Sequence, residues 1–324
     1  MKRGLVVGKF YPPHSGHKYL IDQALAACDE LDVLVCDSTR YSIDARARQQ
    51  WIQEIHPSAR VRVIPDIEED DNSELWAAYT IAFLGYVPDV VYSSEDYGEQ
   101  YAACMGAEHV MVDKQRVTVP ISGTRVRKDP LKEWKFIEHP VRKDLAVRVV
   151  VVGAESTGTT TLAKALAEHY KAPWVPEYGR LYSEGLVYNG SKWEDKDFTH
   201  IAKVQQRLEQ RMATKSNGLV ICDTNATATQ LWQERYLGNI SQDVADIAEK
   251  DIVHYYLLTG DEIPFVQDGT RDGEHIRHDM HQSFIKMLKT KDVPFALIQG
   301  PKDQRLTQAI QLIDTYIEGY AIHD

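Results

Sequence analysis

The sequence predicts an α/β protein that contains two consecutive parallel-sheet domains. At 324 residues the chain is longer than one average domain. A short apolar strand, a glycine-containing loop and an amphipathic helix follow one another twice, first near residue 5 and again near residue 146. Parallel strands need such crossover helices, so each repetition marks the start of a separate sheet.

In the first half, residues 5–7 form an apolar strand and residues 16–28 follow as a helix. The apolar side chains of this helix recur on one face, which is the mark of a helix packed on a sheet: Leu20, Ile21, Ala24, Leu25 and Cys28. Residues 31–36 then form the second strand of a βαβ unit. Further strands are predicted at 61–64, 90–92 and 109–112.

The second half opens with a nearly unbroken β-branched run at 146–152, as expected of a central strand buried on both faces. A helix is predicted at 160–170, and strands at 218–222, 253–258 and 295–298. Residues 128–143, with two prolines and several charges, read as a connection. We therefore place the domains at 1–143 and 144–324.

Composition excludes several classes of protein. The chain is 43% hydrophobic and 26% charged with a net charge of -11, and no basic block suggests a nucleic-acid partner. The four cysteines form no CxxC pair, so we expect reduced thiols and no zinc site. No signal peptide or apolar run of ~20 residues is visible, so we expect a cytoplasmic protein without a membrane partner. The sequence leaves open whether the chain forms a homo-oligomer.

The loop after the first strand, residues 8–17, reads GKFYPPHSGH. Gly8 allows a close backbone approach, and a helix N-terminus beside the loop offers amide groups and a positive dipole to a phosphate. His14 and His17, three residues apart, can face one side and polarise a triphosphate under attack. With Gly8, Lys9 and Phe10, the two histidines resemble the ATP-binding HxGH signature of the nucleotidyltransferase superfamily, which class I aminoacyl-tRNA synthetases share.

A second motif, ISGTRVR at residues 121–127, resembles the ISxTxxR sequence that closes over the ATP phosphates in that superfamily. Ser122 and Thr124 offer hydroxyl groups, and the Arg127 guanidinium suits phosphate oxygens. The two motifs together predict a nucleotidyl transfer site in residues 1–143, with His14, His17 and Arg127 as catalytic groups.

The acceptor is inferred from resemblance. Residues 112–120 (VDKQRVTVP), 93–98 (SSEDYG) and Arg48 with Trp51 are similar to nicotinamide-nucleotide adenylyltransferases of the bifunctional NadR type, over most of residues 4–137. The resemblance implies nicotinamide mononucleotide (NMN) and ATP as substrates, with Mg2+ as cofactor. Trp51 or Trp76 could stack on the nicotinamide ring, although a core position explains either tryptophan equally well.

The second glycine loop, residues 153–161, reads GAESTGTTT and matches the P-loop pattern G-x-x-x-x-G-K-[ST] except at the lysine. Thr159 stands where that lysine is expected. The loop amides can still hold ATP phosphates, and the Thr160 hydroxyl can still bind Mg2+. The predicted ATP-binding residues of this half are Gly153, Gly158, Thr159, Thr160 and Thr161.

In NadR-type proteins the corresponding domain is a ribosylnicotinamide kinase, and ESTG at 155–158 and EYGR at 177–180 resemble it. The resemblance implies nicotinamide riboside as substrate, with Glu177 as its ligand or base and Arg180 as a substrate-binding residue. Asp223, at the end of a strand, stands where P-loop kinases carry a catalytic carboxylate. Arg271 and Arg277 are predicted to lie on a lid over the phosphates.

Three alternatives stay open at this point. The second half could bind nucleotide without catalysis, since its P-loop lacks the lysine. The chain could regulate transcription, as some NadR-type proteins with an additional helix-turn-helix do, but we expect no such domain here. The first half could also adenylylate another phosphate, such as phosphopantetheine.

Overall fold

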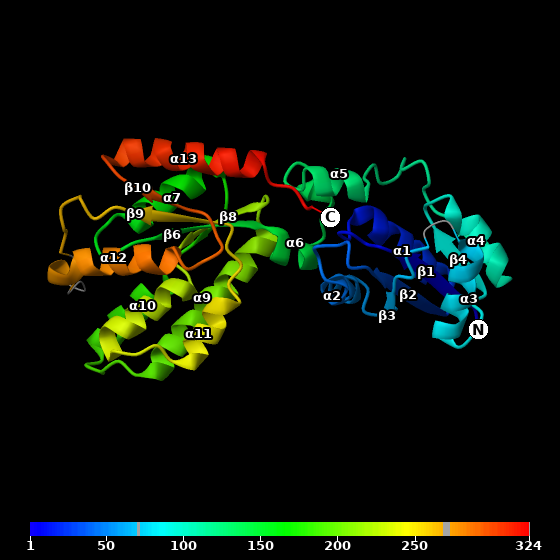
Figure 1. Ribbon diagram of the computed structural model, residues 1–324, viewed down its shortest axis with the longest axis horizontal. Helices are drawn as coiled ribbons and strands as arrows, with labels where there is room; N and C mark the ends of the chain where they lie inside the picture. Colours follow the sequence, from blue (N-terminus) through cyan, green and yellow to red (C-terminus); the bar gives the residue numbers. More distant parts are fainter. Residues whose placement is uncertain (70–71, 268–272, 324) are drawn as a thin grey trace. The chain divides into compact units, whose positions relative to one another are not determined.

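Within the residues that the computed structural model describes, 1–69, 72–267 and 273–323, the chain divides into two compact units, each with a five-stranded parallel sheet (Figure 1). The first unit is Met1–Val141 and the second is Arg142–Gly319. The expected α/β class with two parallel sheets is confirmed. One detail differs from the expected division, because the chain from Tyr320 onward belongs to the first unit.

The first unit alternates strands and helices as its apolar pattern predicts. Its elements are β1 (Arg3–Gly8), α1 (Ser15–Ala27), β2 (Glu30–Asp37), α2 (Ala45–Ile55), β3 (Arg60–Pro65), α3 (Ser73–Leu84), β4 (Val90–Ser93), α4 (Tyr97–Met105), β5 (Glu108–Met111), α5 (Gly123–Lys128), the 3-10 helix η1 (Trp134–Phe136) and α6 (His139–Leu145), which runs past Val141. The strand order is β3-β2-β1-β4-β5. The order reverses between β1 and β4, and ligands of open α/β sheets bind at the carboxyl ends of the strands beside such a reversal.

Both faces of this first sheet are covered. Successive side chains of a strand point to opposite faces, so Leu5 and Val6 in β1 enter different cores. Helices α1 and α2 contribute to the core around Val6, and α3 and α4 to the core around Leu5. Burial on both faces explains why β1 and β2 read as continuous apolar runs rather than alternating ones.

The second unit repeats the doubly wound plan. Its elements are β6 (Val147–Val152), α7 (Thr159–Tyr170), β7 (Trp174–Val175), α8 (Tyr178–Tyr188), α9 (Asp195–Lys215), β8 (Leu219–Asp223), α10 (Ala226–Leu237), α11 (Gln242–Glu249), β9 (Tyr255–Thr259), the 3-10 helix η2 (Glu274–Ile276), α12 (Arg277–Leu288), β10 (Phe295–Ile298) and α13 (Lys302–Glu318). The strand order is β10-β9-β6-β8-β7, with every pair parallel.

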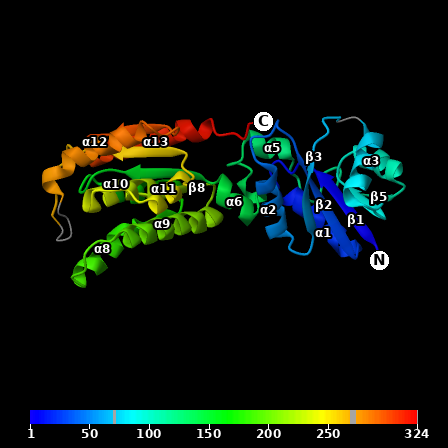
Figure 2. The same ribbon diagram turned by 60° about the horizontal axis from the view of Figure 1, so that its bottom comes forward.

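Strand β6 is the centre of this sheet, and every one of its residues is buried. Helices α7 and α13 pack together on one side, while α9 packs on β7 and β8 with α10 and α11 against it (Figures 1 and 2). The loop after β6 and the end of β8 therefore meet at the carboxyl edge of the sheet, where the chemistry of such folds is placed.

Residues 128–143 are more ordered than a plain connection. They contain η1 and most of α6, and the side chains of Trp134, Ile137 and Val141 are buried. Apolar residues between the charges fold this segment onto the first unit. In the part of the chain that the structure describes, no helix is both long and apolar enough to cross a bilayer.

Replacing a core residue tests the two-sided burial of the first sheet. Leu34 in β2 is fully buried, so Leu34→Ala should destabilise the first unit by about 2–5 kcal/mol. Chemical denaturation followed by circular dichroism measures the change. Leu75→Ala, at a side chain that is 46% exposed, is the matched control and should have little effect. Equal losses in both variants contradict the assigned core.

Candidate functional site

The first motif forms the start of helix α1. His14 is the N-cap residue, and its Nδ1 accepts a hydrogen bond from the Gly16 amide at 3.1 Å. The His14 amide in turn donates to His17 Nδ1 at 3.3 Å, which completes a capping box made of two imidazoles. The rings stack with centroids 3.8 Å apart. Because both Nδ1 atoms accept, each neutral ring carries its proton on Nε2 and can donate from there.

Steric crowding explains why position 16 of the motif is a glycine. A Cβ atom at Gly16 would lie 2.9 Å from His14 Cε1, closer than side chains tolerate. The capping geometry therefore explains the H-x-G-H spacing, since the two imidazoles need positions N-cap and N3, and the ring of His14 excludes a side chain at position 16.

The second motif lies beside the first. Ser122 is the N-cap of α5 and accepts from the Arg125 amide at 3.3 Å. Arg127 Nη1 donates to the Tyr11 carbonyl oxygen at 3.0 Å. A Cβ atom built on Gly123 would be 3.3 Å from Arg127 Nη1 and 4.0 Å from His14 Nε2. The structure thus brings His14 and Arg127, 113 positions apart in the chain (127 − 14), to the same place.

Both histidines are neutral at pH 7 in the free protein. Burial, followed by the charge of Arg116, lowers the pKa of His14 to about 4. Burial, His14 and then Arg116 lower the pKa of His17 well below its ordinary value. The pair therefore offers hydrogen-bond donors to an anion, and the nearby arginines supply the positive charge.

The other predicted residues of this half have varied positions. Lys9 is exposed, with its Nζ 5.8 Å from the centre of the Tyr41 ring, and Phe10 is buried with its ring 5.0 Å from that of His17. Gly8 ends β1, and Thr124 is exposed on α5.

The two tryptophans considered for the nicotinamide ring differ in exposure. Trp51 in α2 is 3% exposed, which is the core position that the sequence left open. Trp76 in α3 is half-buried, packs against the core around Leu5 and donates from Nε1 to the Glu69 carbonyl oxygen at 3.0 Å.

Sequence reasoning missed Tyr11. Its carbonyl oxygen binds Arg127, its ring lies 5.5 Å from the Arg127 guanidinium, and its hydroxyl donates to the His323 carbonyl oxygen at 2.7 Å. The Ile322 amide also donates to the Arg127 carbonyl oxygen at 2.9 Å. The aromatic side chain of Tyr11 inside the histidine motif was the available signal, but no signal marked its partner at the far end of the chain.

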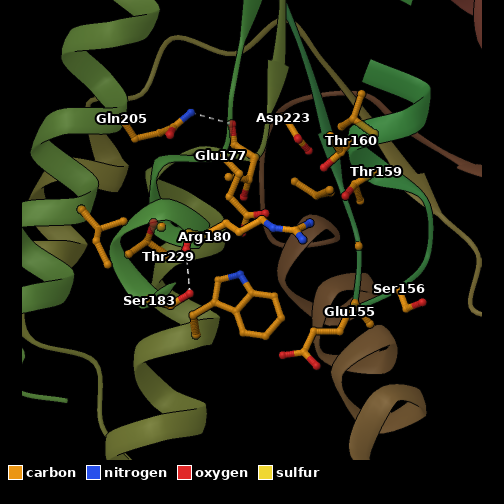
Figure 3. Close-up of a pocket in the computed structure, with 18 of the residues that line it drawn as sticks. Glu155, Ser156, Thr159, Thr160, Glu177, Arg180, Ser183, Gln205, Asp223 and Thr229 are labelled. Atoms are coloured by element: carbon orange, nitrogen blue, oxygen red, sulfur yellow. Dashed lines mark hydrogen bonds between the residues drawn. The ribbon is translucent and has the colours of Figure 1, made fainter. Parts of the chain in front are cut away.

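The second site is a cavity of about 510 Å³ at the carboxyl edge of the second sheet (Figure 3). The P-loop lies on one side and the first turn of α8 faces it across the cavity. The predicted residues that line it are Gly153, Gly158, Thr159, Thr160, Thr161, Glu177, Arg180 and Asp223. All predicted site residues of the second half except those of the lid therefore meet in one cavity.

The P-loop has the tight geometry of a phosphate cradle. A Cβ atom at Gly153 would lie 2.2 Å from Thr259 Oγ1, so the backbone there passes directly against β9. Gly158 has a φ of 86° at the N-cap of α7, a conformation that favours glycine. The amides that follow begin α7 and have no intrahelical acceptors, so they can bind phosphate oxygens.

Asp223 supplies a buried carboxylate at the base of the cavity. It is 1% exposed, and burial raises its pKa to about 6 although hydrogen bonds with Thr160 and Thr159 oppose this. Its Oδ1 has no hydrogen-bond partner among the described residues. An unpartnered carboxylate oxygen next to a P-loop hydroxyl fits Mg2+, which typically takes one or two carboxylates and completes its shell with phosphates and water.

Helix α8 presents Glu177 and Arg180 to the cavity. Glu177 is the N-cap residue, and the turn is fixed by Gln205, whose Oε1 accepts from the Tyr178 amide at 3.0 Å. Figure 3 shows Arg180 extending from this turn towards the loop that carries Thr159. Arg180 also forms an ion pair with Glu184, with Nε and Oε1 3.4 Å apart.

The predicted lid is described in part. Arg271 lies outside the described residues. Arg277, at the start of α12, is 9% exposed and donates from Nη2 to the Ser156 carbonyl oxygen at 3.2 Å, so it contacts the P-loop backbone. Lys164, which follows the P-loop on α7, places its Nζ 4.6 Å from the centre of the Trp174 ring.

An aromatic wall of the cavity was also missed. It consists of Trp193, Trp232 and Tyr236, with the rings of Trp193 and Tyr236 stacked 5.2 Å apart. These residues come from the segment before α9 and from α10, so no local spacing connects them. Beside them, Arg235 Nη1 donates to Glu155 Oε1 of the P-loop at 2.7 Å.

Comparison with known proteins covers both units. A family model described as an AAA domain matches residues 148–305. Two curated relatives, from Escherichia coli (strain K12) and Salmonella typhimurium (strain LT2), are each named trifunctional NAD biosynthesis/regulator protein NadR. Each is 27% identical over 336 residues, covering 96% of this chain and 82% of the relative. The chain is therefore similar to NadR over nearly its whole length.

Solved structures of NadR have a fold similar to that of this chain. A NadR protein in complex with NR has a TM-score of 0.78 and 21% identity, covering 99% of this chain and 98% of its own. A NadR protein in complex with NAD and AMP-PNP has a TM-score of 0.76 at 21% identity, with 98% and 97% covered. Both likenesses extend over the two units, so the order of the two folds is that of NadR.

The buried histidines predict a pH-dependent stability. Between pH 6.5, the ordinary pKa of histidine, and about pH 4, His14 binds a proton in the unfolded chain but stays neutral in the folded protein. The free energy of unfolding therefore falls as the pH drops through this window. His14→Ser keeps an N-cap but removes the imidazole, and should lessen that fall by about 2–4 kcal/mol. Urea unfolding at several pH values measures it; identical pH dependence in both proteins contradicts the assignment.

Proposed function

We propose that the chain makes NAD in two ATP-dependent steps. The second unit phosphorylates nicotinamide riboside to NMN, and the first unit transfers AMP from ATP to NMN, releasing pyrophosphate. The observation that carries the adenylyl transfer is the convergence of the His14–His17 capping box and Arg127 at one helix N-terminus. The phosphorylation of the riboside is supported by the cavity that joins the P-loop, Asp223 and Glu177.

In the adenylyl step, an NMN phosphate oxygen attacks the α-phosphorus of ATP while the bond to the pyrophosphate oxygen breaks. No covalent enzyme intermediate is needed, so the protein contributes positioning and charge stabilisation. The Nε2–H groups of His14 and His17 donate to phosphate oxygens, and Arg127, held by the Tyr11 carbonyl, adds a fixed positive charge. Ser122 and Lys9 contribute further donors.

In the kinase step, the riboside 5′-hydroxyl attacks the γ-phosphorus and ADP leaves. Glu177 takes the hydroxyl proton, the loop amides hold the phosphates, and Asp223 and Thr160 would hold Mg2+, which when bound neutralises phosphate charge. The aromatic wall of Trp193, Trp232 and Tyr236 suits the cationic nicotinamide ring.

Thr159 favours a second candidate for this unit, a module that binds nucleotide without transferring phosphate. The two candidates differ in products. A kinase converts nicotinamide riboside and ATP to NMN and ADP in equal amounts, whereas a binding module takes up nucleotide and yields neither product.

Removing one imidazole tests the adenylyl site. His17→Ala should lower the turnover of NMN to NAD by about 10²–10³-fold, as expected for the loss of a preorganised donor to a developing charge. Chromatographic measurement of NAD gives the rate. His169→Ala, at an exposed histidine of α7, is the control and should be unchanged.

Riboside phosphorylation should persist in His17→Ala, and its loss in a folded protein contradicts two separate sites. Turnover of phosphopantetheine in place of NMN contradicts the proposed acceptor.

Removing the buried carboxylate tests the kinase site. Asp223→Asn keeps the size of the side chain and removes the metal-binding charge, so riboside phosphorylation should fall by about 10²-fold or more while NAD formation from NMN persists. Coupled detection of ADP measures the rate. If the unaltered protein forms no ADP or NMN from riboside, the second unit is the binding module.

A further inference from the structure

The cavity of the second unit lacks the cation that its loop normally provides. In a P-loop the lysine reaches the β- and γ-phosphates, and here Thr159 takes its position at the start of α7. A threonine can donate one hydrogen bond but carries no charge, while the transferred phosphoryl group carries charge over three oxygens. Phosphoryl transfer in this cavity therefore needs a cation from another element.

Several nearby cations are engaged in holding the loop itself. Arg277 donates to the Ser156 carbonyl oxygen at 3.2 Å, and Arg305 donates to the Thr157 carbonyl oxygen at 2.7 Å. Arg235 pairs with Glu155, both side chains being largely buried. Arg277 and Arg305 thus bind carbonyl oxygens of the loop and Arg235 binds a carboxylate, whereas phosphate binds to the loop amides.

Lys164 is also poorly placed for the task. It lies more than one helical turn beyond Thr159 on α7, and its ammonium group rests over the Trp174 ring at 4.6 Å. It is not among the residues that line the cavity.

Arg180 meets the requirement. It lines the cavity from the first turn of α8, on the side opposite the loop, and Figure 3 shows its side chain extending towards Thr159. Asp223, which would hold the metal ion, lines the same cavity as Arg180. The ion pair with Glu184 is long and partly exposed, and ion pairs of this kind contribute little free energy.

We infer that Arg180 replaces the missing P-loop lysine and binds the γ-phosphate of the nucleotide triphosphate during transfer. The inference rests on the proposed kinase function and names the source of its charge. A guanidinium can donate two parallel hydrogen bonds to phosphate, so one arginine from across the cavity serves where a lysine from the loop would. Compared with an ordinary P-loop site, the cation comes from α8 instead of the loop, while the loop amides still bind the phosphates.

A double-mutant cycle between positions 159 and 180 tests this exchange. Arg180→Ala should lower kcat for riboside phosphorylation by about 10²-fold and leave KM for the riboside within about threefold. Thr159→Lys restores a loop lysine. The double variant with Thr159→Lys and Arg180→Ala should therefore have a kcat at least about tenfold higher than that of Arg180→Ala alone. Arg180→Lys should be intermediate. Arg211→Ala, at an exposed arginine of α9 away from the cavity, is the matched control and should be unchanged.

The alternative role of Arg180 is to hold the riboside. In that case Arg180→Ala raises KM for the riboside, and lysine at position 159 gives no rescue. Either result, in a variant whose circular dichroism and unfolding match those of the unaltered protein, overturns the inference without affecting the proposed kinase function.

Binding measurements keep the inference testable if the unit proves not to be a kinase. Calorimetry with Mg·AMP-PNP and Mg·ADP reports the preference for the γ-phosphate without turnover. Arg180→Ala should reduce that preference by about tenfold or more, and Thr159→Lys should restore it. An unchanged preference in Arg180→Ala overturns the inference. Absence of NMN formation by the unaltered protein overturns the kinase function alone.

Discussion

Both candidate sites depend on one property of the polypeptide backbone. A helix that begins where a buried parallel strand ends leaves its first amide groups without intrahelical acceptors, at an edge of the sheet that is open to ligands. After β1 this position is the start of α1, and after β6 it is the start of α7. The first site uses imidazoles to occupy part of that helix end, through the His14 and His17 capping box, and directs their remaining donors outward. In the second site no side chain caps the helix, and arginines from other elements bind the glycine loop.

The strands were predictable because a strand covered on both faces has to be apolar throughout. Residues 146–152 and 31–36 identify β6 and β2 for that reason. Boundaries were less certain where polar residues continue a strand: the predicted strand at 253–258 runs as Tyr255–Thr259, because Thr259 is paired in the sheet and fully buried while His254 lies outside it. The return of the chain from Tyr320 to the first unit had no signal, since it rests on backbone contacts such as that between Ile322 and Arg127.

The candidate sites divide in the same way. Residues that share a loop with a glycine turn, such as His14, His17 and Thr160, carry their spacing in the sequence and were found from it. Residues brought in by the tertiary fold were missed, because charge or aromaticity alone marks no site: Arg116, which acts on both histidines, and the aromatic wall of the cavity. For Trp51 the sequence left two interpretations open. It follows Arg48 on a helix face that packs inward, and burial of that face makes it a core residue.

The loss of the P-loop lysine becomes physically reasonable once the two tasks of the loop are separated. One task is to aim amide groups at phosphate oxygens, and the other is to bring a positive charge to them. Aiming depends on the conformation of residues 153–158, which Arg277, Arg305 and Arg235 fix through Ser156, Thr157 and Glu155. That task is independent of the side chain at position 159. Charge acts through space and can come from any element that borders the cavity, so in a chain with a net charge of -11 it has to be supplied locally. A threonine at position 159 is therefore compatible with a rigid cradle as long as a cation such as Arg180 stands opposite it.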